Sequence, residues 1–72
     1  MGEHQRAIED FDRYIRIAPN YGGVYNNRGA AYYELGQYQR AIADFDKVIQ
    51  LNPDFPKAYN NRGIVYAVLG QH

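Results

Sequence analysis

The chain repeats itself at a spacing of 34 residues. Residues 2–35 align with residues 36–69 and are identical to them at 17 of 34 positions. The matches include the segment Tyr-Asn-Asn-Arg-Gly, which occupies residues 25–29 and again residues 59–63. A period of this length is typical of proteins made of stacked supersecondary units, because each unit buries its apolar face only against its neighbours. The repeat therefore predicts a stacked architecture for all of the 72 residues.

Proline and glycine divide each unit into two helices. Pro19 and Pro53 end one helix in each copy, because the residue before a proline avoids the α conformation. Gly36 and Gly70 stand where a left-handed residue ends the other helix. The connections are short, so successive helices must be antiparallel. We therefore predict an all-α fold of four helices with no strand.

The residues after the prolines are predicted to start the next helices. Asn20 and Asp54 are good N-caps, and Pro56 suits a first helical turn. The whole chain, residues 1–72, is expected to form a single domain. Its predicted parts are a second helix of one unit within residues 3–18, a complete unit at 22–52 and a first helix of the next unit at 55–69.

Composition and charge exclude several classes of protein. The chain has no cysteine, serine or threonine, so it cannot build a thiolate metal site or a Ser- or Cys-based nucleophile. Eight basic residues balance eight acidic ones, whereas nucleic-acid binders normally carry a basic excess. The longest apolar run, Ile64–Leu69, is far shorter than the roughly 20 residues that span a bilayer. We expect no nucleic-acid partner, no membrane insertion and, in the absence of a targeting signal, a cytoplasmic location.

The carboxylates do not form a site. Asp10 with Asp12, and Asp44 with Asp46, are two residues apart, so each pair diverges by about 200° on a helix. We expect a solvated face on which Asp12 pairs with Arg16.

His4 and His72 occupy equivalent repeat positions and are expected to pack at helix starts. No residue set suits acid–base catalysis. We expect no enzyme activity, no metal and no cofactor.

A glycine and an arginine recur at unusual positions inside the predicted helices. Gly29 and Gly63 each cost about 1 kcal/mol relative to alanine, which indicates a close helix–helix contact, with Ala41 as the small partner of Gly29. Arg28 is predicted to pair with Asp44, and Arg62 is expected to lack the equivalent carboxylate. The alternative is that these arginines extend into solvent.

These features resemble the tetratricopeptide repeat (TPR) family. Arg28 and Arg62 depart from the family, which usually has leucine there. The resemblance implies a right-handed superhelical solenoid. If the first and second helix of a unit are called A and B, the four helices of this chain follow the order B-A-B-A. The resemblance rests on the 34-residue period and on six residues with their equivalents in the other copy: Tyr25, Gly29, Tyr32, Ala41, Phe45 and Pro53.

The resemblance implies a scaffold whose A helices line a concave surface that binds a peptide or partner protein. Family members that grip a C-terminal carboxylate use asparagines and basic residues there, and Asn27 and Lys57 match such residues. Asparagine amides also suit an extended backbone, although Asn26 and Asn60 have the alternative of satisfying local backbone groups. The candidate peptide-binding residues are Asn26, Asn27, Tyr33, Lys57, Asn60, Asn61 and Ile64.

The second hypothesis is a self-assembling repeat fragment whose open end helices pair between chains. The first helix offers an apolar face suited to a preceding A helix, and the last helix offers one suited to a following B helix. Pairing of these faces would produce a homo-oligomer. The candidate residues are Ala7, Ile8 and Phe11 at one end and Tyr59, Gly63 and Tyr66 at the other.

Overall fold

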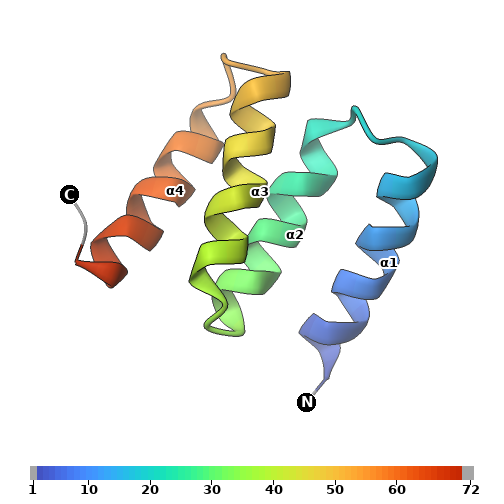
Figure 1. Cartoon of the computed structure of the whole chain (residues 1–72), viewed down its shortest axis with the longest axis horizontal. Coiled ribbons are helices and arrows are strands. Elements are labelled where there is room, and N and C mark those ends of the chain that lie inside the picture. The colour runs from blue at the N-terminus through green and yellow to red at the C-terminus, as the bar shows by residue number, and fades with distance from the viewer. Residues whose placement is uncertain (1, 71–72) are drawn as a thin grey trace.

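Four helices make up the part of the chain that the structure, a computed structural model, describes, residues 2–70. They are α1 (Glu3–Ile17), α2 (Gly22–Glu34), α3 (Tyr38–Leu51) and α4 (Pro56–Leu69). Successive helices run antiparallel and lie side by side in chain order (Figure 1). The predicted all-α fold is confirmed, and no strand occurs within residues 2–70. The position of His72 lies outside these residues.

The helices end where proline and glycine predict. Helices α1 and α3 stop two residues before Pro19 and Pro53. Gly36 and Gly70 follow α2 and α4 with φ angles of 77° and 75°, the left-handed conformation that glycine adopts at low cost. Pro56 occupies the first position of α4, where its missing N–H has no helical partner to lose.

The predicted N-caps were wrong by one residue. Tyr21 and Phe55, not Asn20 and Asp54, are the cap residues of α2 and α4, and no side chain caps either helix. The backbone carbonyls of Tyr21 and Phe55 accept the first bonds, from Val24 and Ala58. Phe55 also packs against the buried cluster around Tyr25 and Val48, so tertiary packing sets where α4 begins.

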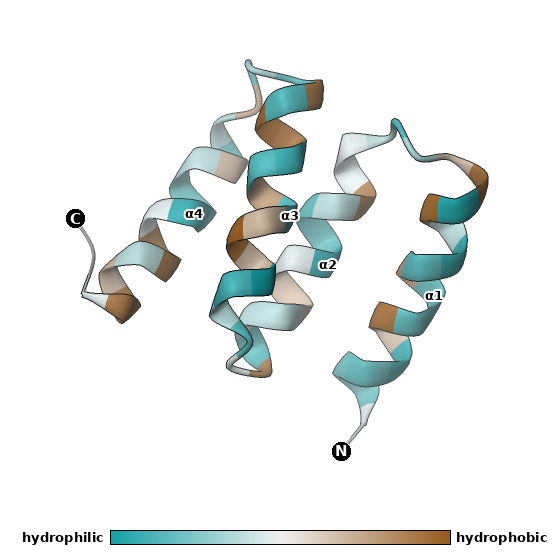
Figure 2. Cartoon of the chain, in the orientation of Figure 1, coloured by the Kyte–Doolittle hydropathy of each residue, from teal (hydrophilic) through white to brown (hydrophobic). Residues whose placement is uncertain are grey.

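Helix α3 supplies more of the buried apolar residues than any other helix, because it packs against both α2 and α4. Apolar segments recur along α3, whereas most of α1 is hydrophilic (Figure 2). One cluster joins Ala41, Ile42 and Phe45 of α3 to Val65 of α4. The other joins Val48 of α3 to Tyr25 of α2 and Ala58 of α4.

Gly29 lies in close contact with the ring of Phe45. A Cβ added at Gly29 would lie 2.7 Å from Cε1 of this ring, so the predicted close approach of α2 and α3 is confirmed. Its partner is Phe45 rather than Ala41, because the helices cross with the ring over the glycine. The equivalent Cβ at Gly63 would meet no described atom within 4 Å beyond its chain neighbours and the backbone of its own helix.

Candidate protein-interaction site

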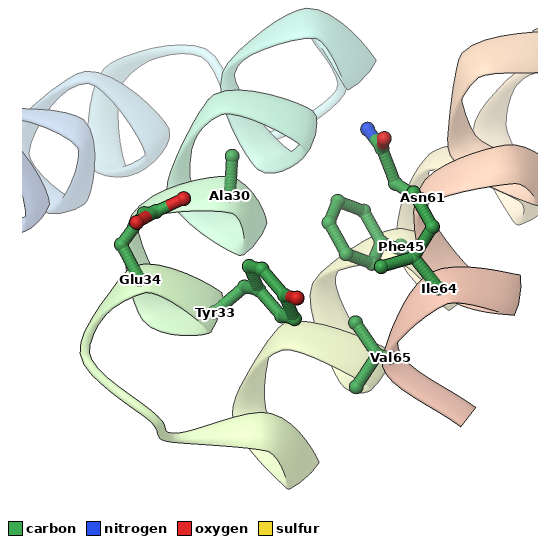
Figure 3. Close-up of a pocket in the computed structure, with 7 residues that line it drawn as sticks. All are labelled: Ala30, Tyr33, Glu34, Phe45, Asn61, Ile64 and Val65. Atoms are coloured by element: carbon green, nitrogen blue, oxygen red, sulfur yellow. The ribbon is translucent and has the colours of Figure 1, made fainter. Parts of the chain in front are cut away.

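A cavity of about 200 Å³ opens between α2 and α4, with α3 beneath it. The ring of Phe45 and the side chains of Ile64 and Val65 make its apolar wall (Figure 3). Tyr33 closes another side, and its ring packs 5.6 Å from that of Tyr38, measured between centroids. The remaining lining residues are Ala30, Glu34 and Asn61.

Two asparagines are bonded across the A helices. Nδ2 of Asn61 on α4 donates to Oδ1 of Asn26 on α2 at 3.1 Å. This bond was not predicted. The sequence indicated either a ligand contact or a local backbone bond for Asn26. Each amide still has a donor and an acceptor to offer a ligand, because an asparagine amide has two N–H groups and two carbonyl lone pairs.

The structure brings together only some of the predicted peptide-binding residues. Tyr33, Asn61 and Ile64 line one cavity, and Asn26 is bonded to Asn61 at its edge. Lys57 and Asn60 are exposed on α4 and line neither this cavity nor the hollow next to it.

The hollow next to the cavity lies between α1 and α2 and includes Asn27. Asn27 is the repeat equivalent of Asn61, and Phe11 in the same hollow is the equivalent of Phe45. The hollow is therefore a second copy of the cavity, one repeat earlier, without the A helix that forms the other wall.

Arg28 ties three helices together. Its Nε and one terminal nitrogen donate to both carboxylate oxygens of Asp44 on α3, at 2.8 and 2.7 Å. The other terminal nitrogen donates to Asp12 on α1 at 2.8 Å. The guanidinium also lies 5.6 Å from the ring centroid of Tyr25 and 5.7 Å from that of Tyr32. The predicted pair of Arg28 with Asp44 is confirmed.

The contact with Asp12 was missed, because Asp12 was expected to pair with Arg16 along α1. The signal was present in the repeat. Asp12 and Arg28 are 16 residues apart, as are Asp46 and Arg62.

Burial and pairing oppose each other at Asp44, which is only 4% exposed. Burial raises the pKa of the Asp44 carboxyl, while the hydrogen bonds from Arg28 lower it by a smaller amount. The same hydrogen bonds raise the pKa of Arg28 further above its ordinary value. A buried carboxylate is costly without its partner, so this arginine is needed for the packing of α2 on α3.

Arg62 repeats this arrangement with one carboxylate fewer. It donates to Asp46 at 2.7 Å and lies 5.6 Å from the Tyr59 ring centroid and 6.0 Å from that of Tyr66. Hydrogen bonding to Asp46 raises the pKa of Arg62. Within residues 2–70 it has no equivalent of Asp44, as expected, but the partner Asp46 was not anticipated.

The candidate self-association residues differ in accessibility. Ile8 is only 3% exposed, so its assignment to an open face was wrong: α2 packs against the side of α1 that carries it. Ala7 and Phe11 are half-buried and line the hollow. At the other end, Gly63 is exposed and Tyr59 is 45% exposed, whereas Tyr66 is half-buried against the cluster around Phe45.

The described part of the chain offers neither a cluster of metal ligands nor a helix that could span a membrane. It contains no group of three or more His, Cys, Asp or Glu side chains that could hold a metal ion. None of its helices combines the length and the apolar character needed to cross a membrane.

Comparison with known proteins identifies the repeat. A family model described as "TPR repeat" matches residues 30–70, which is more than half of the chain. The chain belongs to the tetratricopeptide repeat family. A second model, described as "Tetratricopeptide repeat", matches residues 11–43. No curated protein matches the chain. TPR domains generally mediate protein–protein interactions, and they are typically non-catalytic.

Proposed function

We propose that this TPR chain binds an extended peptide segment of a partner protein across α2 and α4, with one apolar side chain of the peptide in the cavity between them. The observation that carries the proposal is the cavity itself. Its apolar wall, formed by Phe45, Ile64 and Val65, lies beside the bonded amides of Asn26 and Asn61.

The size of the cavity favours a peptide side chain over a small molecule. Small-molecule sites usually enclose roughly 300–1,000 Å³, and this cavity encloses about 200 Å³. An apolar anchor in a small pocket, surrounded by polar contacts, is how many protein interfaces concentrate their binding energy. The Asn26–Asn61 bond supports this role, because it holds two amides ready for the backbone of an extended peptide.

The charges at the rim predict which residues flank the anchor. Glu34 is exposed at the cavity edge and forms no ion pair with the other described residues. We therefore expect a basic residue beside the apolar anchor of the peptide. Capture of a peptide carboxylate by Lys57 together with Asn27 is not part of the proposal, because Asn27 lies in the separate hollow.

The test is selection from a display library of random peptides, followed by calorimetric titration of a selected peptide. The selected peptides should share an apolar residue next to a basic one. Ile64→Asp should weaken their binding at least tenfold, which corresponds to about 1.4 kcal/mol. The matched control is Val68→Asp, because Val68 is also half-exposed on α4 but does not line the cavity.

Two results would refute the proposal. One is peptide binding that is equally strong in the parent chain, Ile64→Asp and Tyr33→Ala. The other is a library that yields no binder to the parent chain. A nucleic-acid function is distinguished separately: tight binding to generic RNA that falls steeply with added salt would contradict a protein partner.

A further inference from the structure

Helix α4 carries the surface with which α2 binds α3, but on α4 this surface is open. The two helices share the sequence Tyr-Asn-Asn-Arg-Gly, at residues 25–29 and 59–63. On α2, Gly29 lies under the ring of Phe45. On α4, a Cβ at Gly63 would meet no described atom within 4 Å beyond its chain neighbours and the backbone of α4 itself. The aromatic ring that the repeat places over this glycine is missing.

A carboxylate is missing at the same place. Arg28 binds two carboxylates. Asp44 belongs to the B helix of its own repeat unit, and Asp12 belongs to the B helix of the preceding unit. Arg62 binds only the equivalent of Asp12, which is Asp46. The surface of α4 therefore lacks two partner residues from a neighbouring helix: an aspartate for Arg62 and a phenylalanine for Gly63. On α3 the corresponding residues, Asp44 and Phe45, are adjacent in sequence.

Helix α1 has an aspartate and a phenylalanine at these repeat positions, without the contacts that Asp44 and Phe45 make. Asp10 and Phe11 are the repeat equivalents of Asp44 and Phe45. Asp10 is exposed and forms no ion pair among the described residues. Phe11 is half-buried and lines the hollow, whereas Phe45 is only 1% exposed.

A third contact has the same complementarity. Nζ of Lys47 lies 5.9 Å from the ring centroid of Tyr25, which is 7% exposed. The equivalent of Tyr25 on α4 is Tyr59, which is 45% exposed. The equivalent of Lys47 on α1 is Arg13, a cation that suits the face of an aromatic ring.

We propose that α4 of one copy of this chain binds α1 of a second copy, as α2 binds α3. Asp10 of the second copy pairs with Arg62, and Phe11 of the second copy packs on Gly63. The contact joins two different faces, so it does not close on itself and can add further copies in a row.

The second copy is chosen as the occupant because its charges and shape complement α4. The competing occupant is a helix elsewhere in a longer protein with the same Asp–Phe pair. Sedimentation velocity of the 72-residue chain over a range of concentrations separates the two. The proposal expects an average mass that increases with concentration, and less association at high salt. A chain that stays monomeric at every concentration would assign the surface to the other occupant and overturn the proposal.

Charge reversal tests the proposed pairing. Asp10→Arg and Arg62→Glu should each weaken association at least tenfold, because each one opposes like charges at the contact. An equimolar mixture of the two variants should associate again, since the glutamate introduced at position 62 of one variant meets the arginine introduced at position 10 of the other. A mixture that stays dissociated, or single variants that associate like the parent, would contradict the pairing.

The matched controls lie on the outer face of α1. Glu9→Arg and Arg16→Glu make the same charge changes at positions whose equivalents on α3, Ala43 and Gln50, are exposed. Both should associate like the parent chain, and an equal loss in these controls would show that only net charge matters.

Arg62→Glu also removes the bond to Asp46, so a variant that keeps the fold is needed. Gly63→Gln fits, because the space at Gly63 is open and glutamine favours a helix. It should retain the helical circular dichroism of the parent and abolish association. Undiminished association of this variant would overturn the proposal.

Discussion

Alanine at Gly29 and alanine at Gly63 are the same substitution at equivalent positions of the repeat, in two different environments. At Gly29 the new methyl group would lie 2.7 Å from Cε1 of Phe45 and 3.0 Å from its Cδ1 and Cζ. At Gly63 it would meet no described atom within 4 Å beyond its chain neighbours and the backbone of its own helix. Comparing the two substitutions therefore separates the contribution of helix propensity to stability from the contribution of packing.

The two contributions can be estimated separately. Alanine is more favourable than glycine inside a helix by about 0.8–1.0 kcal/mol, and at Gly63 nothing opposes this gain. At Gly29 the ring of Phe45, only 1% exposed, has little space to move, and overpacking a core costs about 1–3 kcal/mol. Gly63→Ala should stabilise the chain by about 1 kcal/mol. Gly29→Ala should leave it unchanged or destabilise it by up to about 2 kcal/mol.

The assay is thermal and urea unfolding followed by circular dichroism, in dilute solution so that association does not contribute. For a domain of this size, each kcal/mol corresponds to a shift of roughly 4–8 °C in Tm. Phe45→Leu provides the control, because a smaller side chain should relieve much of the penalty of Gly29→Ala. Equal stabilisation by both alanine variants would refute the packing argument.

The remaining predictions concern the Arg28 network and the helix ends. Arg28→Leu leaves the carboxyl of Asp44 buried without its guanidinium, so the free energy of unfolding should fall by about 3 kcal/mol in urea titrations, and Asp44→Leu in the same chain should restore part of it. Burial already raises the pKa of Asp44 and the bonds from Arg28 oppose this, so in Arg28→Leu the folded state holds this proton more tightly than the unfolded state does. The deficit relative to the parent should therefore grow as the pH rises from about 4, the unfolded pKa of aspartate, towards 7, and a deficit that shrinks would contradict this sign. Tyr25→Phe removes the bond at 2.7 Å from the Tyr25 hydroxyl to the carbonyl of Pro19 and should lower the free energy of unfolding by about 1 kcal/mol. Gly36→Ala forces alanine to a φ of 77° and should lower Tm, with a cost of about 1–2 kcal/mol.

The sequence by itself determines the four helices and their order. The 34-residue period, the prolines and the left-handed glycines are local signals, and they act through backbone geometry whatever packs around them. The start of α4 is different. Asp54 is the better capping side chain, yet the helix begins after Phe55, because the Phe55 ring packs on the cluster around Tyr25 and Val48.

The pairing of Arg28 with Asp44 could also be predicted, because both residues recur at a constant phase of the repeat. The second partner, Asp12, could not be deduced from α1 alone, since Arg16 is the nearer cation along the helix and Arg28 reaches Asp12 only across the α1–α2 contact. The packing partner of Gly29 depends on tertiary structure in the same way. The way α2 and α3 cross places Phe45, rather than Ala41, over the glycine.

The candidate site shows the same division. The family resemblance implies that Tyr33, Asn61 and Ile64 share one surface of the A helices, and all three line the cavity, but the resemblance does not indicate which neighbour covers that surface. Only the tertiary structure bonds Asn61 to Asn26 and leaves Lys57 outside the cavity. The same holds for Ile8, which is apolar and on a helix face like Phe11, but which α2 buries while Phe11 stays half-buried. Local rules follow from the backbone of one chain segment, whereas burial depends on the helix that packs against it.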